Sequence, residues 1–414
     1  MPKVWTHRKP CRLCNSRNVL PLFKFAFTPP AACFVRPDGS AGCVEKIPLI
    51  VSRCGQCGLL QMLDVVDPGI LFREDVHASM VTSTMARYVE TLADELLSEG
   101  RIRKGDLVVD IGCGDGSLLR ALKKRGMRVA GIDPSAASAN QAAKDDIPHQ
   151  RDFFTPAVAN TVLKEHGPAT LVIAQHTLGS IDNLHAVMAG IRYLLKQDGL
   201  FIFEEPALAD LLAGNRFDAV HHDRLTFLTA ATMDPFLRST HMHLIEARRT
   251  DHRGGTFRGY VQRSDGPHVA AATLKPYADG ERAAGIYNVD KLNEFVSRVE
   301  AVKRQVQALV TKQLEKGRKV AGYGASARTV TFIHECGWTA EQIAFVVDDN
   351  PLKQGLLIPG TDIPVYGPSA LKEKKPDLIL LFAGHHAEVI LKQHDAYRQS
   401  GVTFLGLLPT PAPA

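Results

Sequence analysis

The chain has little that would hold it in a membrane or on a nucleic acid. Its 414 residues contain no apolar run of about eighteen, the length that a membrane-spanning helix needs. The first residues, MPKVWTHRKPCRLC, lack the apolar stretch of a secretory signal, so we expect a cytoplasmic protein. No block of five or more Lys or Arg residues concentrates the formal charge of +5. We therefore expect neither a membrane nor a nucleic acid as partner, whereas anionic small molecules stay open.

Repeats and disorder-promoting stretches are scarce as well. Hydrophobic residues make up 45% of the chain and charged residues 22%, which is ordinary for a globular protein. A single hydrophobic core stops growing at roughly 250–300 residues, so a chain of 414 residues predicts two or three domains.

Four of the eight cysteines form two C-x-x-C pairs, and these are Cys11, Cys14, Cys54 and Cys57. In a reducing compartment such pairs indicate a metal site more than disulfides, with redox chemistry as the alternative. Four thiolates at about 2.3 Å fill the tetrahedral shell of Zn²⁺ and leave no open position. The pattern predicts a structural zinc site in a small, loop-rich N-terminal module.

Strand-like and helical segments alternate along the middle of the chain. The strand-like runs are 107–111, 128–132, 170–174 and 200–204. Such alternation predicts a doubly wound α/β domain with a parallel sheet. After a long amphipathic helix at 288–316, a strand, glycine turn and helix begin at 319, and strands are expected at 343–347 and 378–382. The fold class is therefore α/β with a second Rossmann-like domain at the C-terminus.

A glycine-rich turn follows the first of these strands. Asp110 precedes Gly112, Gly114 and Gly116, and glycines at such a turn let the backbone approach a ligand closely. Asp133 ends the next strand, where a carboxylate accepts ribose hydroxyls. A nicotinamide dehydrogenase also has these features. The acid at position 110 instead favours an S-adenosylmethionine (SAM) enzyme, in which it helps to hold the methionine end of the cofactor.

Polar side chains follow the later strands of the same domain. Asp152 and Phe153 stand where adenine is contacted in such folds, although a polar turn beside core phenylalanines is the alternative. His176, Glu204 and Glu205 lie at strand ends, and ligands of open α/β sheets bind at that edge.

One loop beyond the fourth strand concentrates ionisable groups, namely His221, His222, Asp223 and Arg224. Such a set can take a proton from carbon and stabilise the resulting enolate. A solvated polar turn is the competing interpretation.

Together these features resemble the sugar C-methyltransferases that act on nucleotide-linked keto-deoxysugars in antibiotic and lipopolysaccharide pathways. The resemblance covers nearly the whole chain and includes the C-x-x-C pairs, the 110–116 loop, the 204–227 region and the C-terminal stretches 322–325, 347–355 and 359–365. It implies SAM as cofactor, structural Zn²⁺ and a nucleotide-linked sugar as small-molecule substrate, with monomer or dimer left open. The domains implied are a zinc-binding domain at 1–72, a methyltransferase domain at 73–285, a Rossmann-like domain at 286–408 and a disordered tail at 409–414.

The loop departs from the family where the chemistry takes place. The family reads Tyr-His-Glu-His-Leu, and its last His removes the proton beside the keto group. Here that position is Arg224, which stays protonated at neutral pH. Three alternatives follow: His222 or His221 is the base, with Asp223 orienting an imidazole; the acceptor is O or N; or Arg224 holds a carboxylate or phosphate. We favour the first.

The resemblance also implies where the substrate binds. His77 lies in a segment that lines the substrate pocket in the family, and the second Rossmann-like half holds the nucleotide end. Ser326 and Arg328 at the start of a helix are expected to donate to a pyrophosphate, unless this turn serves packing alone. His385 and His386, which follow the expected strand at 378–382, are further candidates. A SAM-binding protein without catalysis is the non-enzymatic alternative.

Overall fold

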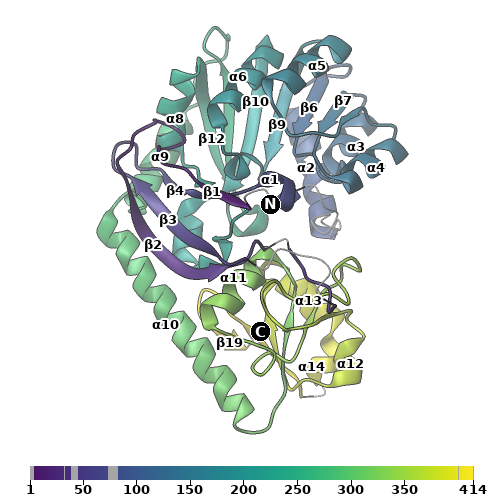
Figure 1. Ribbon diagram of the computed structural model, residues 1–414. Helices are drawn as coiled ribbons and strands as arrows, with labels where there is room; N and C mark the ends of the chain where they lie inside the picture. The colour runs from purple at the N-terminus through teal and green to yellow at the C-terminus, as the bar shows by residue number, and fades with distance from the viewer. Residues whose placement is uncertain (1–3, 32, 39–44, 73–82, 400, 414) are drawn as a thin grey trace.

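The computed structural model describes residues 4–31, 33–38, 45–399 without 73–82, and 401–413. Figure 1 shows the central domain above the C-terminal domain, with the N-terminal module against both and α10 (Val289–Leu314) running along one side. Among the described residues, no helix combines the length and the apolar character of a membrane span.

The N-terminal module is built on antiparallel strands. β1 (Trp5–His7) pairs with β5 (Asp64–Val66), and a second sheet contains β2 (Val19–Thr28), β3 (Ile47–Cys54) and β4 (Leu60–Met62). The short helix α1 (Pro68–Phe72) follows β5. A strand from far along the chain completes this second sheet, because β11 (Thr226–Phe227) pairs with β4. The loop predicted to carry the catalytic groups is therefore attached to the module.

The central domain has a seven-stranded sheet in the order β12-β13-β10-β9-β6-β7-β8. The strands are β6 (Leu107–Ile111), β7 (Arg128–Ile132), β8 (His149–Gln150), β9 (Ala169–Gln175), β10 (Leu195–Pro206), β12 (Met242–Thr250) and β13 (Thr256–Arg263). The first five are parallel and β13 runs antiparallel to both its neighbours. All four strand-like runs predicted here fall in observed strands.

Helices cover both faces of this sheet. They are α2 (Ser83–Ser98), α3 (Ser117–Lys124), α4 (Ala136–Lys144), α5 (Pro156–His166), α6 (Leu184–Leu194), α7 (Leu208–Ala213), α8 (Ala230–Ser239) and α9 (Leu274–Ala283). Alternate residues of one strand enter two different cores: Val108 packs on one face, and Val109 and Ile111 on the other. Burial on both faces explains why β6 is apolar almost throughout.

The C-terminal domain has a six-stranded sheet in the order β16-β15-β14-β17-β18-β19. Its strands are β14 (Val320–Tyr323), β15 (Val346–Val347), β16 (Val365–Tyr366), β17 (Leu378–Leu381), β18 (Thr403–Gly406) and β19 (Ala412–Pro413). Its helices are α11 (Ala327–Cys336), α12 (Ala370–Lys374), α13 (Ala387–Gln393) and α14 (Asp395–Gln399). The tail differs from the predicted disorder, because β19 pairs antiparallel with β18 at the sheet edge.

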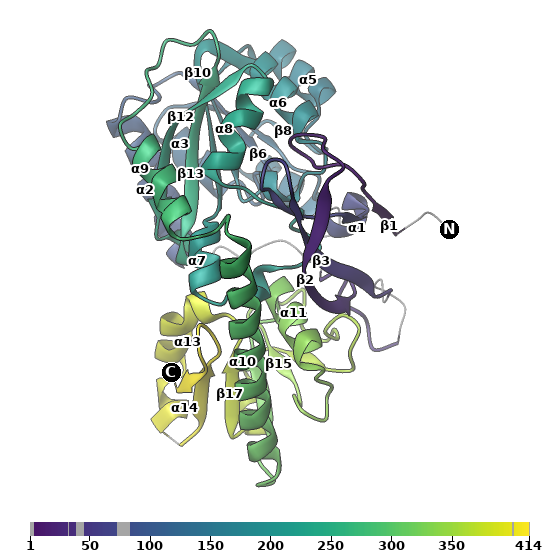
Figure 2. The same cartoon turned by 90° about the vertical axis from the view of Figure 1, so that its left-hand side faces the viewer.

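The long helix α10 joins the domains. Its buried residues recur three and four positions apart, which is the period of one helix face, and they are Leu292, Phe295, Val299, Val302, Val306 and Val310. Figure 2 shows α10 descending from the central domain along the C-terminal domain. All six residues belong to a single hydrophobic cluster that also contains Phe23 of the N-terminal module, Phe217 of the central domain and Phe332 of the C-terminal domain.

Candidate active site

The four cysteines converge at one end of the N-terminal module. Their Sγ atoms lie within 4.8 Å of one another; Cys11 and Cys57 are 3.6 Å apart, and Cys14 and Cys54 are 3.5 Å apart. Tetrahedral Zn²⁺ with Zn–S bonds of about 2.3 Å separates its sulfurs by about 3.8 Å. The hydrogen bond with Cys57 lowers the pKa of Cys11, which favours a thiolate. The donor set fits a structural zinc ion.

The zinc knuckle is anchored on the central domain. Arg12 is fully buried, and its Nε donates to Asp182 over 3.0 Å. Arg8 pairs with the same carboxylate at 2.9 Å, and a ring nitrogen of His185 lies 3.1 Å from the carbonyl of Leu13. Burial lowers the pKa of Arg12 to about 10, so the guanidinium stays charged at neutral pH. The module is thus held in place by an ion pair between the buried Arg12 and the partly exposed Asp182.

The glycine-rich turn after β6 is shaped for close approach. Gly112, Gly114 and Gly116 have φ values of 74°, 54° and 72°, a region that favours glycine. A Cβ on Gly112 would lie 2.3 Å from Oγ1 of Thr177, a residue that follows β9. The loop therefore lies directly against the end of the neighbouring strand.

The acidic residues around this turn fit a cationic, hydroxyl-bearing ligand. Asp110 is buried, and no described residue provides a hydrogen-bond partner for its Oδ1. Burial, and then the charge of Asp133, raise the pKa of Asp110 to about 8. Asp133 accepts from the backbone N–H groups of Gly114 (3.0 Å) and Ser135 (2.9 Å). An unsatisfied buried carboxylate beside a glycine cradle suits the ammonium group of SAM.

Asp152 and Phe153 follow β8, near the carboxyl ends of β7 and β8. The Asp152 carboxylate accepts a hydrogen bond of 2.8 Å from the backbone N–H of Phe153. This places the pair at the same sheet edge as Asp133, and their role at adenine stays a prediction.

Two adjacent carboxylates end β10, and both are buried and bound. Glu204 accepts from Nε of Arg258 (2.7 Å) and Nε2 of Gln175 (2.6 Å), and from the Tyr88 hydroxyl. Glu205 accepts from Nη1 of Arg224 (2.7 Å) and the backbone N–H of Gly179 (2.8 Å). Burial raises the pKa of Glu205. These contacts favour structural roles for both acids, although each borders the site.

The side chains of the predicted catalytic loop, residues 221–224, point in two directions. Arg224 extends to the carboxylate of Glu205 at the sheet edge. His222 is buried, and its Nε2 lies 3.2 Å from the carbonyl oxygen of Pro48 in the N-terminal module. Nδ1 of His221 is 3.8 Å from the carboxylate of Asp223. Burial lowers the pKa of His222, so this imidazole is neutral at pH 7.

His176 lies at the end of β9, beside the cofactor loop. Its φ is 54°, which is unusual for a residue other than glycine. No described residue forms a hydrogen bond with either of its ring nitrogens. Burial, and then the charge of Arg253, hold the pKa of His176 well below its usual range. The fold thus places the neutral imidazole of His176 next to the glycine turn, with no described hydrogen-bond partner on either ring nitrogen.

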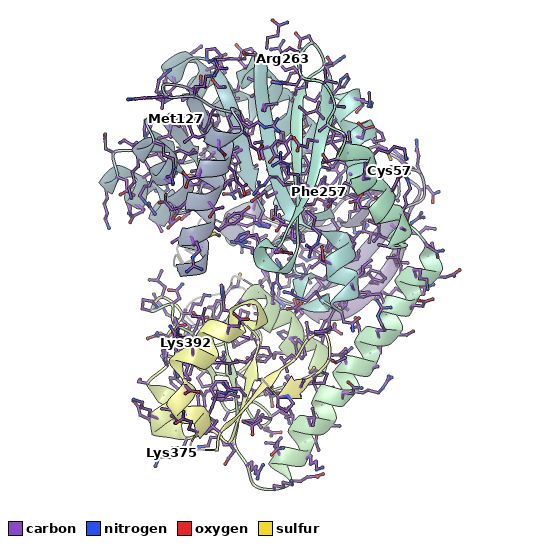
Figure 3. The ribbon with its side chains drawn as sticks, turned by 180° about the vertical axis from the view of Figure 1, so that it is seen from behind. Cys57, Met127, Phe257, Arg263, Lys375 and Lys392 are labelled. Atoms are coloured by element: carbon purple, nitrogen blue, oxygen red, sulfur yellow. The ribbon has the colours of Figure 1, made fainter. Side chains whose placement is uncertain are left out.

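Three residues at this edge were missed from the sequence. The ring of His252 stacks on Tyr88 with centroids 3.6 Å apart and lies 5.9 Å from the ring of His176. Arg253 follows in the turn η4 (His252–Gly254) between β12 and β13. Figure 3 labels both ends of β13, and Phe257 marks the end toward the C-terminal domain. The only sequence signal was a His-Arg-Gly-Gly turn in a region without clear periodicity.

The predicted substrate residues of the C-terminal half occupy the start of α11. The hydroxyls of Ser326 and Thr329 lie 3.2 Å apart and cap the helix. Nη1 of Arg328 lies 3.8 Å from the carboxylate of Asp218. His386 is close enough to Arg253 for its pKa to be lowered by that charge, after the larger effect of burial. His77 lies outside the described residues.

Protein-family models match all three parts of the chain. Residues 11–72 match a domain described as zinc binding, residues 81–251 a methyltransferase domain and residues 251–409 the C-methyltransferase C-terminal domain. The C-methyltransferase NovU of Streptomyces niveus is 29% identical over 404 residues, which is 97% of this chain and 96% of the relative.

Solved structures match less than half of the chain. One is the magnesium protoporphyrin IX methyltransferase of Synechocystis PCC 6803, 18% identical, covering 45% of this chain and 90% of its own, with a TM-score of 0.35. Another is the 1,6-didemethyltoxoflavin-N1-methyltransferase of Burkholderia thailandensis, which is 16% identical. The match covers 43% of this chain and 78% of that enzyme, with a TM-score of 0.32.

Proposed function

We propose that this chain, which is similar to C-methyltransferase NovU, is a SAM-dependent C-methyltransferase that methylates a carbon next to a carbonyl group in a nucleotide-linked keto-deoxysugar or a related small molecule. The observation that carries this proposal is the neutral imidazole of His176 beside the cofactor turn, with no described partner for either nitrogen. We propose a cytoplasmic location, where the four cysteines stay reduced and available to zinc.

A carbon nucleophile requires a base, because a C–H bond next to a carbonyl must lose its proton before carbon can attack. SAM bound at the glycine turn would supply the methyl group, and a side chain of the protein would take up the proton that the carbon loses. A neutral imidazole near pH 7 is suited to this task. His176 is our first candidate because it ends the strand next to the cofactor turn. His222 is the second, since its Nδ1 has no described partner while Nε2 is bound to Pro48.

Positive charge at the same edge supports stabilisation of the enolate oxygen. Arg224 forms an ion pair with Glu205, and its positive charge also lowers the pKa of His176. The guanidinium cannot act as the base, but it favours a negative oxygen nearby. We assign Arg224 this electrostatic role, with His221 and Asp223 positioning the loop.

The substrate's nucleotide end is proposed to bind at the C-terminal domain. Ser326 and Arg328 at the start of α11, with His386 after β17, offer donors there. His77, Glu204 and Glu205 complete the proposed substrate-binding set; the two acids act through Arg258 and Arg224.

The test uses methyl-labelled SAM and a panel of nucleotide-linked 4-keto-6-deoxysugars. Mass spectrometry reads label transfer and NMR identifies the methylated atom. Label on carbon supports the proposal. Label on oxygen or nitrogen supports the second candidate, an O- or N-methyltransferase, which the arginine at position 224 favours. SAM binding without transfer to any acceptor would contradict both and indicate a non-catalytic SAM-binding protein.

A further inference from the structure

The carboxylate of Asp133 is held by both of its oxygens. Oδ2 accepts a hydrogen bond of 3.0 Å from the backbone N–H of Gly114, and Oδ1 accepts one of 2.9 Å from the backbone N–H of Ser135. The direction of this carboxylate therefore depends on where the glycine turn places Gly114. A Cβ on Gly114 would have no described atom within 4 Å, so the position of this residue depends on its backbone hydrogen bonds.

The carbonyl group of Gly114 is bound by a side chain of the helix that follows Asp133. The Ser138 hydroxyl donates to the carbonyl oxygen of Gly114. Ser135 is the N-cap of α4, and its Oγ accepts from the backbone N–H of Ser138 over 3.2 Å. This contact keeps Ser138 in the first turn of α4, where it is buried against the glycine turn. Gly114 is thus fixed at its N–H and at its C=O.

The Ser138 hydroxyl has a single proton, and its neighbours determine where that proton points. The carbonyl of Gly114 can only accept, so the proton is used there. Nε2 of His149 lies 3.2 Å from Oγ of Ser138, and Sγ of Cys113 lies 3.7 Å from it. Both groups then donate to the hydroxyl oxygen, which assigns the Nε2–H tautomer to His149. Burial raises the pKa of Cys113 well above its usual value, so the thiol keeps its proton.

A glycine in the neighbouring strand makes room for these contacts. His149 of β8 lies opposite Gly131 of β7. A Cβ on Gly131 would lie 2.8 Å from Sγ of Cys113 and 3.4 Å from Cδ2 of His149. Glycine within a strand weakens the strand and often marks a close approach of other groups. Here it allows the thiol and the imidazole to lie beside the Ser138 hydroxyl.

We propose that Ser138 and His149 are positioning residues for SAM, which act by fixing Gly114 and, through it, the carboxylate of Asp133. Hydrogen bonds in such a chain strengthen one another, and a group that is already oriented binds its ligand at a lower entropic cost. The inference deepens the proposed function. It rests on Asp133 as the residue that accepts the ribose hydroxyls of SAM, and it is independent of the methyl acceptor.

The test is a double-mutant cycle, measured by calorimetric titration of the zinc-loaded full chain with S-adenosylhomocysteine. Ser138→Ala should bind about tenfold more weakly than the wild type, because the carbonyl of Gly114 loses its donor. Asp133→Asn should weaken binding by about tenfold or more, as one partner of the ribose hydroxyls is altered. In the Asp133→Asn background, Ser138→Ala should change the affinity by less than about twofold, since Ser138 acts through Asp133.

Two substitutions of His149 test the donor to Ser138. His149→Gln keeps an N–H donor close to the position of Nε2 and should bind S-adenosylhomocysteine as the wild type does. His149→Phe lacks the donor and should bind roughly threefold more weakly. Ser239→Ala is the matched control, because it removes a hydroxyl that donates to the carbonyl of Phe236 over 2.7 Å in α8. Its affinity should equal that of the wild type.

Three results would overturn the inference: wild-type affinity in Ser138→Ala, wild-type affinity in Asp133→Asn, or an equal loss from Ser138→Ala in both backgrounds. The last result is the one expected if Ser138 only stabilises the fold. If Ser138→Ala does not fold, the His149 pair decides, and equal affinities of the Gln and Phe variants would overturn the inference. A negative labelled-SAM assay with keto-deoxysugars leaves these titrations unaffected, so the two proposals fail separately.

Discussion

Nε2 of His222 lies 3.2 Å from the carbonyl oxygen of Pro48, and this contact ties the loop after β10 to strand β3 of the N-terminal module. Four residues further on, Thr226 begins the strand that pairs with β4. Between these two attachments, Arg224 extends to Glu205 at the edge of the central sheet. The geometry of the loop therefore depends on the module that holds the four cysteines.

Loss of zinc should weaken both the module and the catalytic loop. Cys57→Ser removes one of four thiolates, so we expect the bound zinc to fall well below one ion per chain, the thermal unfolding midpoint to drop and methyl transfer to slow. Metal analysis, thermal unfolding and the labelled-SAM assay measure these effects. Cys336→Ser, at a buried thiol in the C-terminal domain, is the control and should retain full zinc. Full zinc content in Cys57→Ser would exclude the site.

The two candidate bases are separated by paired substitutions. His176→Asn should reduce kcat by roughly a hundredfold or more with unchanged SAM affinity, because general base catalysis contributes about 10²–10⁴-fold. His222→Asn keeps a donor for the carbonyl of Pro48, and we expect a much smaller loss of kcat. His222→Ala should lower the free energy of unfolding by about 1–3 kcal/mol, since the carbonyl loses its partner. A large kcat loss in His222→Asn alone would instead assign the base to His222.

A methyl group on Gly112 should block the cofactor turn. At Gly112→Ala, the new Cβ would lie 2.3 Å from Oγ1 of Thr177, and rotation of that side chain would still leave the Cβ of Thr177 at a tight 3.1 Å. We expect SAM affinity to fall at least tenfold in a binding titration. Gly105→Ala is the matched control, with a φ of 90° and nothing within 4 Å, so it carries backbone strain without a clash. Equal SAM affinity in the two variants would contradict this account of the turn.

SAM affinity should rise with pH because of Asp110. Its pKa of about 8 in the free protein means that the carboxyl is largely protonated at pH 7 and must release a proton to pair with an ammonium group. The association constant should therefore increase by up to tenfold per pH unit below pH 8 and level off above it. Asp110→Asn should bind more weakly and lose this pH dependence, while any dependence due to the ligand's own ammonium group remains. An identical pH profile for both proteins would count against the role of Asp110.

The raised pKa of Asp110 also affects the folding stability of the protein without ligand. A carboxyl whose folded pKa is raised above its unfolded value near 3.9 stabilises the fold most below that value, and this contribution is lost as pH rises through about 8. Denaturant unfolding of wild type and Asp110→Asn between pH 5 and 9 should therefore show a decline in the wild type that the variant lacks. If the stability of the two proteins changed with pH in the same way, this contribution of Asp110 would be excluded.

The parts of the fold that the sequence predicted are those encoded by local patterns. The strand 107–111, its glycine turn and the C-x-x-C pairs each carry their signal within a few residues, and the structure has them where they were expected. The boundaries near residues 72 and 285 stay predictions.

Contacts between distant segments left no such signal. Arg258 reaches Glu204 because β13 pairs antiparallel with β10, and Tyr88 reaches the same carboxylate from a helix before the sheet. The direction of His222 depends on a strand more than 170 residues earlier. At the tail, pairing of β19 with an edge strand outweighed a proline-rich composition typical of disorder.

The hydrophobic cluster around α10 sets the unit in which this chain unfolds. Because it draws side chains from all three parts, none of them can separate without exposing apolar surface of the others. We therefore expect the three parts to unfold in one cooperative transition, unlike domains that are joined only by a linker. We expect a destabilising change in the zinc module or in α10 to affect the loop that carries Arg224 as well.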